Sequence, residues 1–404
     1  MDYYASPNTV LGALQRGLGR GAHGAASTLG AAGPVTACLE DDWRWDTQVD
    51  EREVYLARLV RDLRMPIAPV IGLLDGEKSY PVALGVLEAL GRAGIGAAVD
   101  GVRDHVRRGV RWVDALETVA RTWPPEYWED LYPLVADRID GIGEYDAWWP
   151  AAPWTVWADR DERIAAAIQA TSNRHERPRR PFADTPAATL LDLLRQGQRA
   201  DDWSAALGEL RRRPPEPAVL EIAEDLAGER GAGRLHGVIE EMGDVAVPAA
   251  RRWVTVADHP LTWTALRVLA AHGDAGDAPA LAAGLEWLDA RPNDRCGYHD
   301  LARGLARVGG PAAVAVVSRL HQLWFSPHSY ERAGYLDALV TLDADGAQRK
   351  IVEGLWDCEA DVRLLAVRHT PMDDLLRRRL EYLRDDPMET AEVRAAATGR
   401  LTGR

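Results

Sequence analysis

The side chains best suited to binding or catalysis gather in the stretch WRWDTQVDER, residues 43–52. Tryptophan and arginine anchor many protein interfaces, and a carboxylate beside them adds charge specificity. If the stretch is extended, Trp43 and Trp45 lie on one side of the backbone. We therefore predict a small partner-binding patch in which Trp45 lies with Asp46 and Arg52, and Trp43 beside them. The alternative is that the tryptophans pack as a cap on the last unit of a helical array.

A second group of aromatic residues occupies 122–157, which holds six of the fifteen tryptophans of the chain. Exposed tryptophan is typical of interfaces because it buries a large area at little cost in side-chain entropy. The same rings could instead fill a joint between two blocks of helices that do not stack regularly. The sequence leaves both interpretations open, and the partner-binding candidates in this segment are Trp148, Trp149, Trp154 and Trp157.

Enzyme motifs are weak throughout the chain. The sequence contains no G-x-S-x-G, H-E-x-x-H or C-x-x-C pattern, and the glycine-rich residues 17–24 lack the preceding strand and the G-K-[ST] ending of a phosphate loop. Cys296 and His299 could bind zinc with His321 and His328 only if the two pairs converged in the fold. We therefore expect no catalytic residue, no metal site and no cofactor.

The charge balance narrows the class of partner. The chain carries 62 acidic and 48 basic residues, a net charge of −14, whereas nucleic-acid-binding proteins usually carry a positive excess. Nucleic acid is therefore an unlikely partner, and we expect a protein with a basic surface. No apolar run is long enough to span a membrane and no secretory signal is visible, so we expect a cytoplasmic protein that does not enter membranes. Three widely spaced cysteines argue against a disulfide framework. The oligomeric state is left open.

Internal repeats indicate the elements that position these residues. The pattern E-R-x-x-Y-L-x-x-L-V occurs at 51–60 and again at 331–340, in both cases with helical periodicity. Asp50, followed three residues later by Glu53, resembles a capping box, so we predict that Asp50 caps the first of these helices. Similar helix-turn-helix units recur every 27–36 residues or so, which is typical of helical repeat arrays.

Two repeat segments carry a resemblance to a known family. DVRLLAV at 361–367 and EVRAAAT at 392–398 resemble the D/E-V-R-x-x-A-A pattern of HEAT-like repeats. The irregular spacing fits tetratricopeptide repeats less well, because those keep a fixed period. The resemblance covers 190–404 well, 50–120 moderately and 121–189 poorly. It implies an all-α fold, a right-handed α-solenoid of stacked helix-turn-helix repeats.

The predicted solenoid has two blocks. Residues 1–170 form an N-terminal helical block that includes the tryptophan-rich segment, 171–189 form a linker, and 190–404 form a C-terminal block. Such arrays bury a continuous core by stacking and present extended concave surfaces to partners.

The resemblance implies no common catalytic residue, so we expect a non-enzymatic scaffold that binds another protein through its concave or aromatic surfaces. The alternative is an enzyme on the same array, such as an alkylpurine DNA glycosylase, although those enzymes rely on a basic concave face. The iron-binding hydroxylases of this type carry several His-Glu pairs. Here the one such pair is His175 and Glu176, in the linker.

Overall fold

The computed structural model describes residues 4–27, 30, 32–143, 147–174, 180–196, 200–227, 232–291 and 296–403. These residues form helices connected by turns, and no strand occurs among them. The all-helical prediction is therefore confirmed. None of the described helices is both long and apolar enough to cross a membrane.

The chain forms two compact units. The first contains residues 1–177, 325–333 and 348–404, and the second contains 178–324 and 334–347. The predicted division placed 190–404 in one block, whereas here the last helices pack with the first ones. The boundary at 177/178 falls inside the predicted linker, 171–189.

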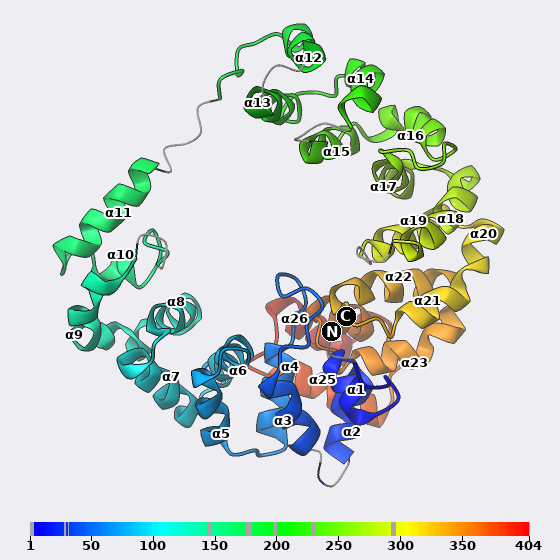
Figure 1. Ribbon diagram of the computed structural model, residues 1–404. Coiled ribbons are helices and arrows are strands. Elements are labelled where there is room, and N and C mark those ends of the chain that lie inside the picture. The colour runs from blue at the N-terminus through cyan, green and yellow to red at the C-terminus, as the bar shows by residue number, and fades with distance from the viewer. Residues whose placement is uncertain are drawn as a thin grey trace. The chain divides into compact units, whose positions relative to one another are not determined.

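The first unit combines helices from both ends of the chain (Figure 1). Its N-terminal helices are α1 (Val10–Gln15), α2 (Gly19–Ser27), α3 (Ala32–Glu40), α4 (Glu53–Asp62), α5 (Ile67–Gly72), α6 (Tyr80–Arg92), α7 (Gly96–Arg108), α8 (Trp112–Thr122), α9 (Tyr132–Val135), α10 (Trp154–Trp157) and α11 (Glu162–Arg174). Its C-terminal helices are α24 (Ala360–His369), α25 (Asp374–Asp385) and α26 (Ala391–Thr402).

The second unit contains the helices from the middle of the chain. They are α12 (Ala187–Gln196), α13 (Ala200–Leu210), α14 (Ala218–Leu226), α15 (Ala232–Glu240), α16 (Val247–Trp253), α17 (Thr262–His272), α18 (Ala278–Asp289), α19 (Tyr298–Val308), α20 (Gly310–Ala315) and α21 (Val317–Leu323). The residues of α22 (Arg332–Leu342) and α23 (Ala344–Gly354) are divided between the two units.

Short 3₁₀ helices lie in both units. They are η1 (Leu73–Asp75), η2 (Pro125–Tyr127), η3 (Glu129–Leu131), η4 (Ala136–Gly141), η5 (Gly243–Ala246), η6 (Ala275–Asp277) and η7 (Ser329–Glu331).

Helices of the second unit contact one another in order along the chain. Among the described residues, α13, α15, α17 and α19 each contact the next one in this series, and Figure 1 shows them side by side. α16 packs against α17, and α18 packs against α19.

The core of the first unit joins segments that lie far apart in sequence. Buried residues such as Leu14, Tyr55 and Leu87 belong to the same apolar cluster as Cys358 and Met388 near the C-terminus. The backbone also links the two ends, because the N–H of Cys358 donates to the carbonyl of Gly17 at 3.0 Å. The N-terminal helices therefore complete their core with C-terminal residues.

Both copies of the repeated motif form helices, α4 and α22, as predicted. The predicted capping role of Asp50 is wrong. Arg52 is the N-cap residue of α4 and makes no side-chain capping bond. The carboxylate of Asp50 instead accepts hydrogen bonds from Asp46 and from residues 328–330, so it is not available to the free amides of the helix.

Candidate functional site

The segment between α3 and α4, residues 41–50, is the best candidate for a binding site, and we call it the Trp-Asp loop. It has no regular secondary structure, and three aspartates spaced four residues apart fix its shape. Asp42 accepts from the backbone N–H of Arg44 at 3.0 Å, Asp46 accepts from that of Gln48 at 2.8 Å, and Asp50 accepts from that of Asp46 at 2.8 Å. Such local bonds between a side chain and the backbone are what hold a turn in one conformation.

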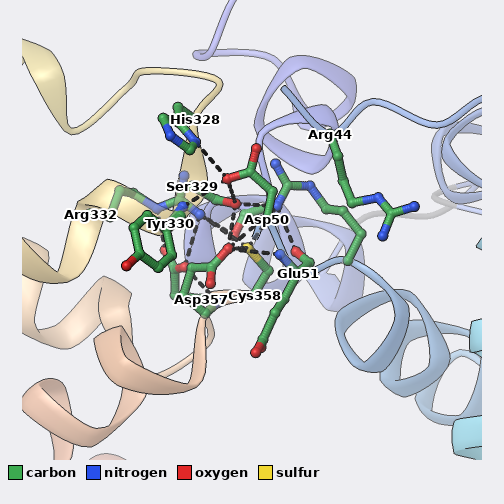
Figure 2. A network of polar contacts seen from close by, with 12 residues as sticks. Arg44, Asp50, Glu51, His328, Ser329, Tyr330, Arg332, Asp357 and Cys358 are labelled. Carbon is green, nitrogen blue, oxygen red and sulfur yellow. Dashed lines mark hydrogen bonds and ion pairs between the residues drawn. The ribbon is translucent and has the colours of Figure 1, made fainter. Parts of the chain in front are cut away.

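Asp50 fastens the loop to the rest of the unit (Figure 2). Its Oδ1 atom lies 2.8 Å from His328 Nδ1 and 3.0 Å from the Ser329 hydroxyl, and it accepts a hydrogen bond from the Tyr330 N–H at 2.9 Å. Burial alone would raise the pKa of Asp50, but the hydrogen bonds outweigh it and hold the pKa well below its ordinary value. Asp50 is therefore a buried carboxylate that stays ionised.

Two arginines from the repeated motif meet beneath the loop. Arg52 Nη1 donates to the Ser329 hydroxyl at 2.7 Å and to Cys358 Sγ at 2.9 Å. Arg332 forms two bonds of 2.9 Å to Asp357 and one of 3.2 Å to Cys358 Sγ. Arg52 is 3 % exposed and Arg332 is fully buried. The structure therefore places Arg52, a predicted partner-binding residue, inside a buried polar network, apart from the exposed part of the loop.

Burial controls the protonation of the acidic groups in this network. It raises the pKa of the Cys358 thiol well above its ordinary value, despite the guanidinium of Arg52 beside it. It also raises the pKa of Glu359 to about 7, although a hydrogen bond from Ser329 acts in the opposite direction. Cys358 is therefore a neutral thiol, and Glu359 titrates near neutral pH.

His328, Ser329 and Asp50 are the residue types of a hydrolytic triad, but their geometry is different. In such a triad the imidazole lies between the serine hydroxyl and the carboxylate. Here His328 and Ser329 both contact the same Asp50 oxygen, and Ser329 is fully buried. The Ser329 hydroxyl also contacts the carboxylate of Glu359, so it links Asp50 to the C-terminal part of the unit. The arrangement differs from a hydrolytic triad and holds the loop in place.

A pocket opens beside the loop. Its volume is about 400 Å³, and it is lined by Tyr4, Asp41, Asp42, Trp43 and Lys78. The Tyr4 hydroxyl donates to the carbonyl of Trp43 at 2.7 Å, and the centroids of the two rings lie 5.5 Å apart at an interplanar angle of 60°. Both oxygens of Asp42 are held by Arg44. Asp41 makes no hydrogen bond or ion pair to a described residue.

Exposed aromatic side chains lie at this end of the unit. Trp45 is 45 % exposed, Tyr330 is 46 % exposed, and Asp50 binds the backbone of Tyr330. Val49, in the same loop, is also exposed. Trp43 is half-buried and lines the pocket, whereas Trp45 is exposed. Asp46 follows Trp45 in the loop and is partly buried.

The tryptophan-rich segment is placed differently. Trp154 and Trp157 are fully buried, and Trp149 is 6 % exposed. The ring centroids of Trp149 and Trp154 lie 5.0 Å apart, and those of Trp154 and Trp157 lie 5.9 Å apart. Trp148 is the exception, with 59 % of its surface exposed. Three of the four candidates in this segment are therefore core residues of the first unit.

Two of the histidines predicted as possible zinc ligands contact carboxylates instead. His328 contacts Asp50, and His321 contacts Asp343 at 3.0 Å. No group of three or more His, Cys, Asp or Glu side chains in the described part of the chain could hold a metal ion. His175 and Glu176 lie outside the described residues.

Sequence reasoning missed several members of the site. Tyr4 and Lys78 line the pocket from positions far from the loop in sequence, and no pattern links them to it. Ser329 and Glu359 support the loop from the C-terminal part of the unit. The repeated Glu-Arg step at 51–52 and 331–332 was a signal, because both arginines enter the same buried network.

A comparison of the chain with family models, with curated proteins and with solved structures finds no match, so the roles of these residues rest on their geometry.

Proposed function

We propose that the chain is a non-enzymatic HEAT-like repeat protein that binds a partner protein with a basic surface, and that the Trp-Asp loop is the binding surface. The observation that carries the proposal is an exposed tryptophan, Trp45, on a loop that aspartates hold in one shape beside a pocket of about 400 Å³. Because the loop is already ordered, little conformational entropy is lost when a partner binds.

Charge supports a basic partner. Residues 40–51 contain six carboxylates and one basic side chain, Arg44. Arg44 binds Asp42 and Glu53, and Asp50 binds His328. Glu51 interacts with Arg363 and accepts a hydrogen bond from the backbone of Ala360. The remaining carboxylates of this stretch, Glu40, Asp41 and Asp46, give the loop around Trp45 an acidic character. Opposite charge on the partner would speed association and fix its orientation.

The proposed architecture is the right-handed α-solenoid of stacked helix-turn-helix repeats in two blocks. The contacts of α13 with α15, of α15 with α17 and of α17 with α19 support stacking of successive units in the second unit. We place the protein in the cytoplasm, on the sequence features alone.

The alternative, a DNA glycosylase on the same array, has less support. The pocket that contains Trp43 and two aspartates has one exposed lysine, Lys78, on its wall. Binding to a phosphate backbone needs several cations along the binding surface.

The test is capture of partners from extracts of the native host with the tagged full-length chain. The wild type, Trp45→Ala and the control Tyr127→Ala are compared, since both aromatic side chains are exposed and Tyr127 is not among the predicted partner-binding residues. We expect a partner that the wild type and the control retain, that Trp45→Ala loses, and that high salt releases because salt screens exposed charges. Equal capture by Trp45→Ala, or recovery of the chain alone, would overturn the proposal.

A further inference from the structure

A second pocket lies in the second unit and is lined by residues of α15, α17 and α19. These helices lie side by side in Figure 1. Its volume is about 340 Å³, at the lower end of the range for small-molecule sites. The charged side chains in its wall include Glu240, Arg267, Asp300, Arg303 and Arg307. Three guanidinium groups face two carboxylates, an excess of one positive charge in a chain whose net charge is −14.

Arg307 covers the C-terminal end of α17. Its Nε donates to the carbonyl of Ala270 at 3.0 Å, its Nη1 to that of Gly273 at 2.8 Å, and its Nη2 to that of Leu269 at 3.0 Å. A helix C-terminus repels anions through its free carbonyl groups. Arg307 removes that repulsion and fixes its own position, and two of its five N–H groups stay free of these bonds.

Arg267 forms ion pairs with both carboxylates of the pocket. Its Nη1 lies 2.9 Å from Glu240, and its Nε lies 3.3 Å from Asp300. The three side chains form a bridge from α15 across α17 to α19. The negative charge in the wall is therefore already paired within the protein.

Arg303 takes part in none of these hydrogen bonds and ion pairs. It lies on α19, three residues after Asp300 and four before Arg307, so all three are on the same face of the helix. It is exposed and donates to no residue that the structure describes. A guanidinium has five N–H donors arranged to match the two oxygens of a carboxylate or phosphate.

We propose that this pocket binds a small molecule through a phosphate or carboxylate group, with Arg303 as the principal ligand and the free N–H groups of Arg307 as the second. The aliphatic side chains of Val268, Ala270 and Ala271 provide an apolar wall for the rest of the ligand. The site is independent of the Trp-Asp loop and of the function proposed for it.

The probes are inorganic phosphate and malonate, titrated separately into the full-length chain by isothermal calorimetry at constant ionic strength. We expect saturable binding of one or both with a millimolar Kd. If only phosphate binds, the natural ligand carries a phosphate group. If only malonate binds, it carries a carboxylate. If both bind, the pocket recognises the oxygen atoms that the two groups share.

Variants locate the binding. Arg303→Gln should weaken it at least about tenfold, and Arg303→Lys, which keeps the charge but loses the fork, should weaken it less. The control is Arg195→Gln on α12, which removes the same charge from an exposed arginine outside the pocket. The proposal is overturned if neither anion binds saturably, or if Arg303→Gln binds like the wild type while the chain stays folded by circular dichroism.

Discussion

Trp45 and Trp154 come from two tryptophan-rich stretches of the same unit, yet 45 % of Trp45 is exposed and none of Trp154. Trp154 contacts the rings of Trp112, Trp149 and Trp157, and its indole N–H donates to Glu117. Trp45 makes no ring contact or hydrogen bond to a described residue. The rings around Trp154 pack on one another and fill a core. The backbone around Trp45 is held by hydrogen bonds to aspartates, and this leaves the ring of Trp45 exposed.

The largest expected effect is on the buried stretch. Trp154→Ala should lower the free energy of unfolding by about 3–5 kcal/mol, the usual cost of truncating a packed tryptophan. Chemical denaturation followed by circular dichroism measures it. The average point substitution costs about 1 kcal/mol of stability. A loss smaller than this would mean that the ring of Trp154 is not packed in a core.

A smaller loss of folding stability is expected when Asp50, at the base of the Trp-Asp loop, is changed. Asp50→Asn keeps the shape of the side chain but replaces a charged acceptor of four polar contacts, so we expect a cost of about 1–3 kcal/mol. The backbone N–H groups of Asp46 and Tyr330 should exchange faster with deuterium. Unchanged stability together with unchanged exchange would show that Asp50 does not hold the loop.

The buried network should also make stability depend on pH. Burial raises the pKa of Glu359 to about 7, and the bond to Asp50, which outweighs the effect of burial, raises the pKa of His328. A folded-state pKa above the unfolded value gives stability at low pH that is lost as the pH rises through the folded pKa. We expect a loss of about 1–2 kcal/mol between roughly pH 6 and pH 8.

Glu359→Gln serves as the control for this pH dependence. The variant keeps the size of the side chain and cannot ionise, so its stability should fall less over the same range. A wild-type profile that rises from pH 6 to pH 8 or so would contradict the sign worked out from these two groups.

The smallest effect is expected at Trp148. Because its side chain is 59 % exposed, Trp148→Ala should change the free energy of unfolding by no more than about 0.5 kcal/mol. The same denaturation experiment measures it beside Trp154→Ala. A large loss of stability in Trp148→Ala would contradict the distinction between the exposed Trp148 and the buried Trp154.

Sequence patterns predicted the helices better than the site. The repeated motif gave α4 and α22 because helical periodicity is local. The patch of Trp43, Trp45 and Asp46 stays a prediction. The role of Asp50 could not be predicted in this way. Its partners are 278 to 280 residues further along the chain, and only the packing of both chain ends into one unit brings them together.

The same limit applies to Arg52. Its charge and its neighbours in sequence suggested a surface residue, since arginine is rarely buried without partners. Ser329 and Cys358 supply those partners from distant segments. The HEAT-like resemblance stays a prediction, supported by the order of helix contacts in the second unit.

The most direct test of the account is the affinity of Trp45→Ala for the captured partner, measured by calorimetry beside its thermal unfolding. The account predicts binding weaker by about 2 kcal/mol, roughly 30-fold in Kd, with a melting temperature close to that of the wild type. Wild-type affinity in this variant, or a loss of binding that only accompanies unfolding, would contradict the claim that the Trp-Asp loop is the binding surface.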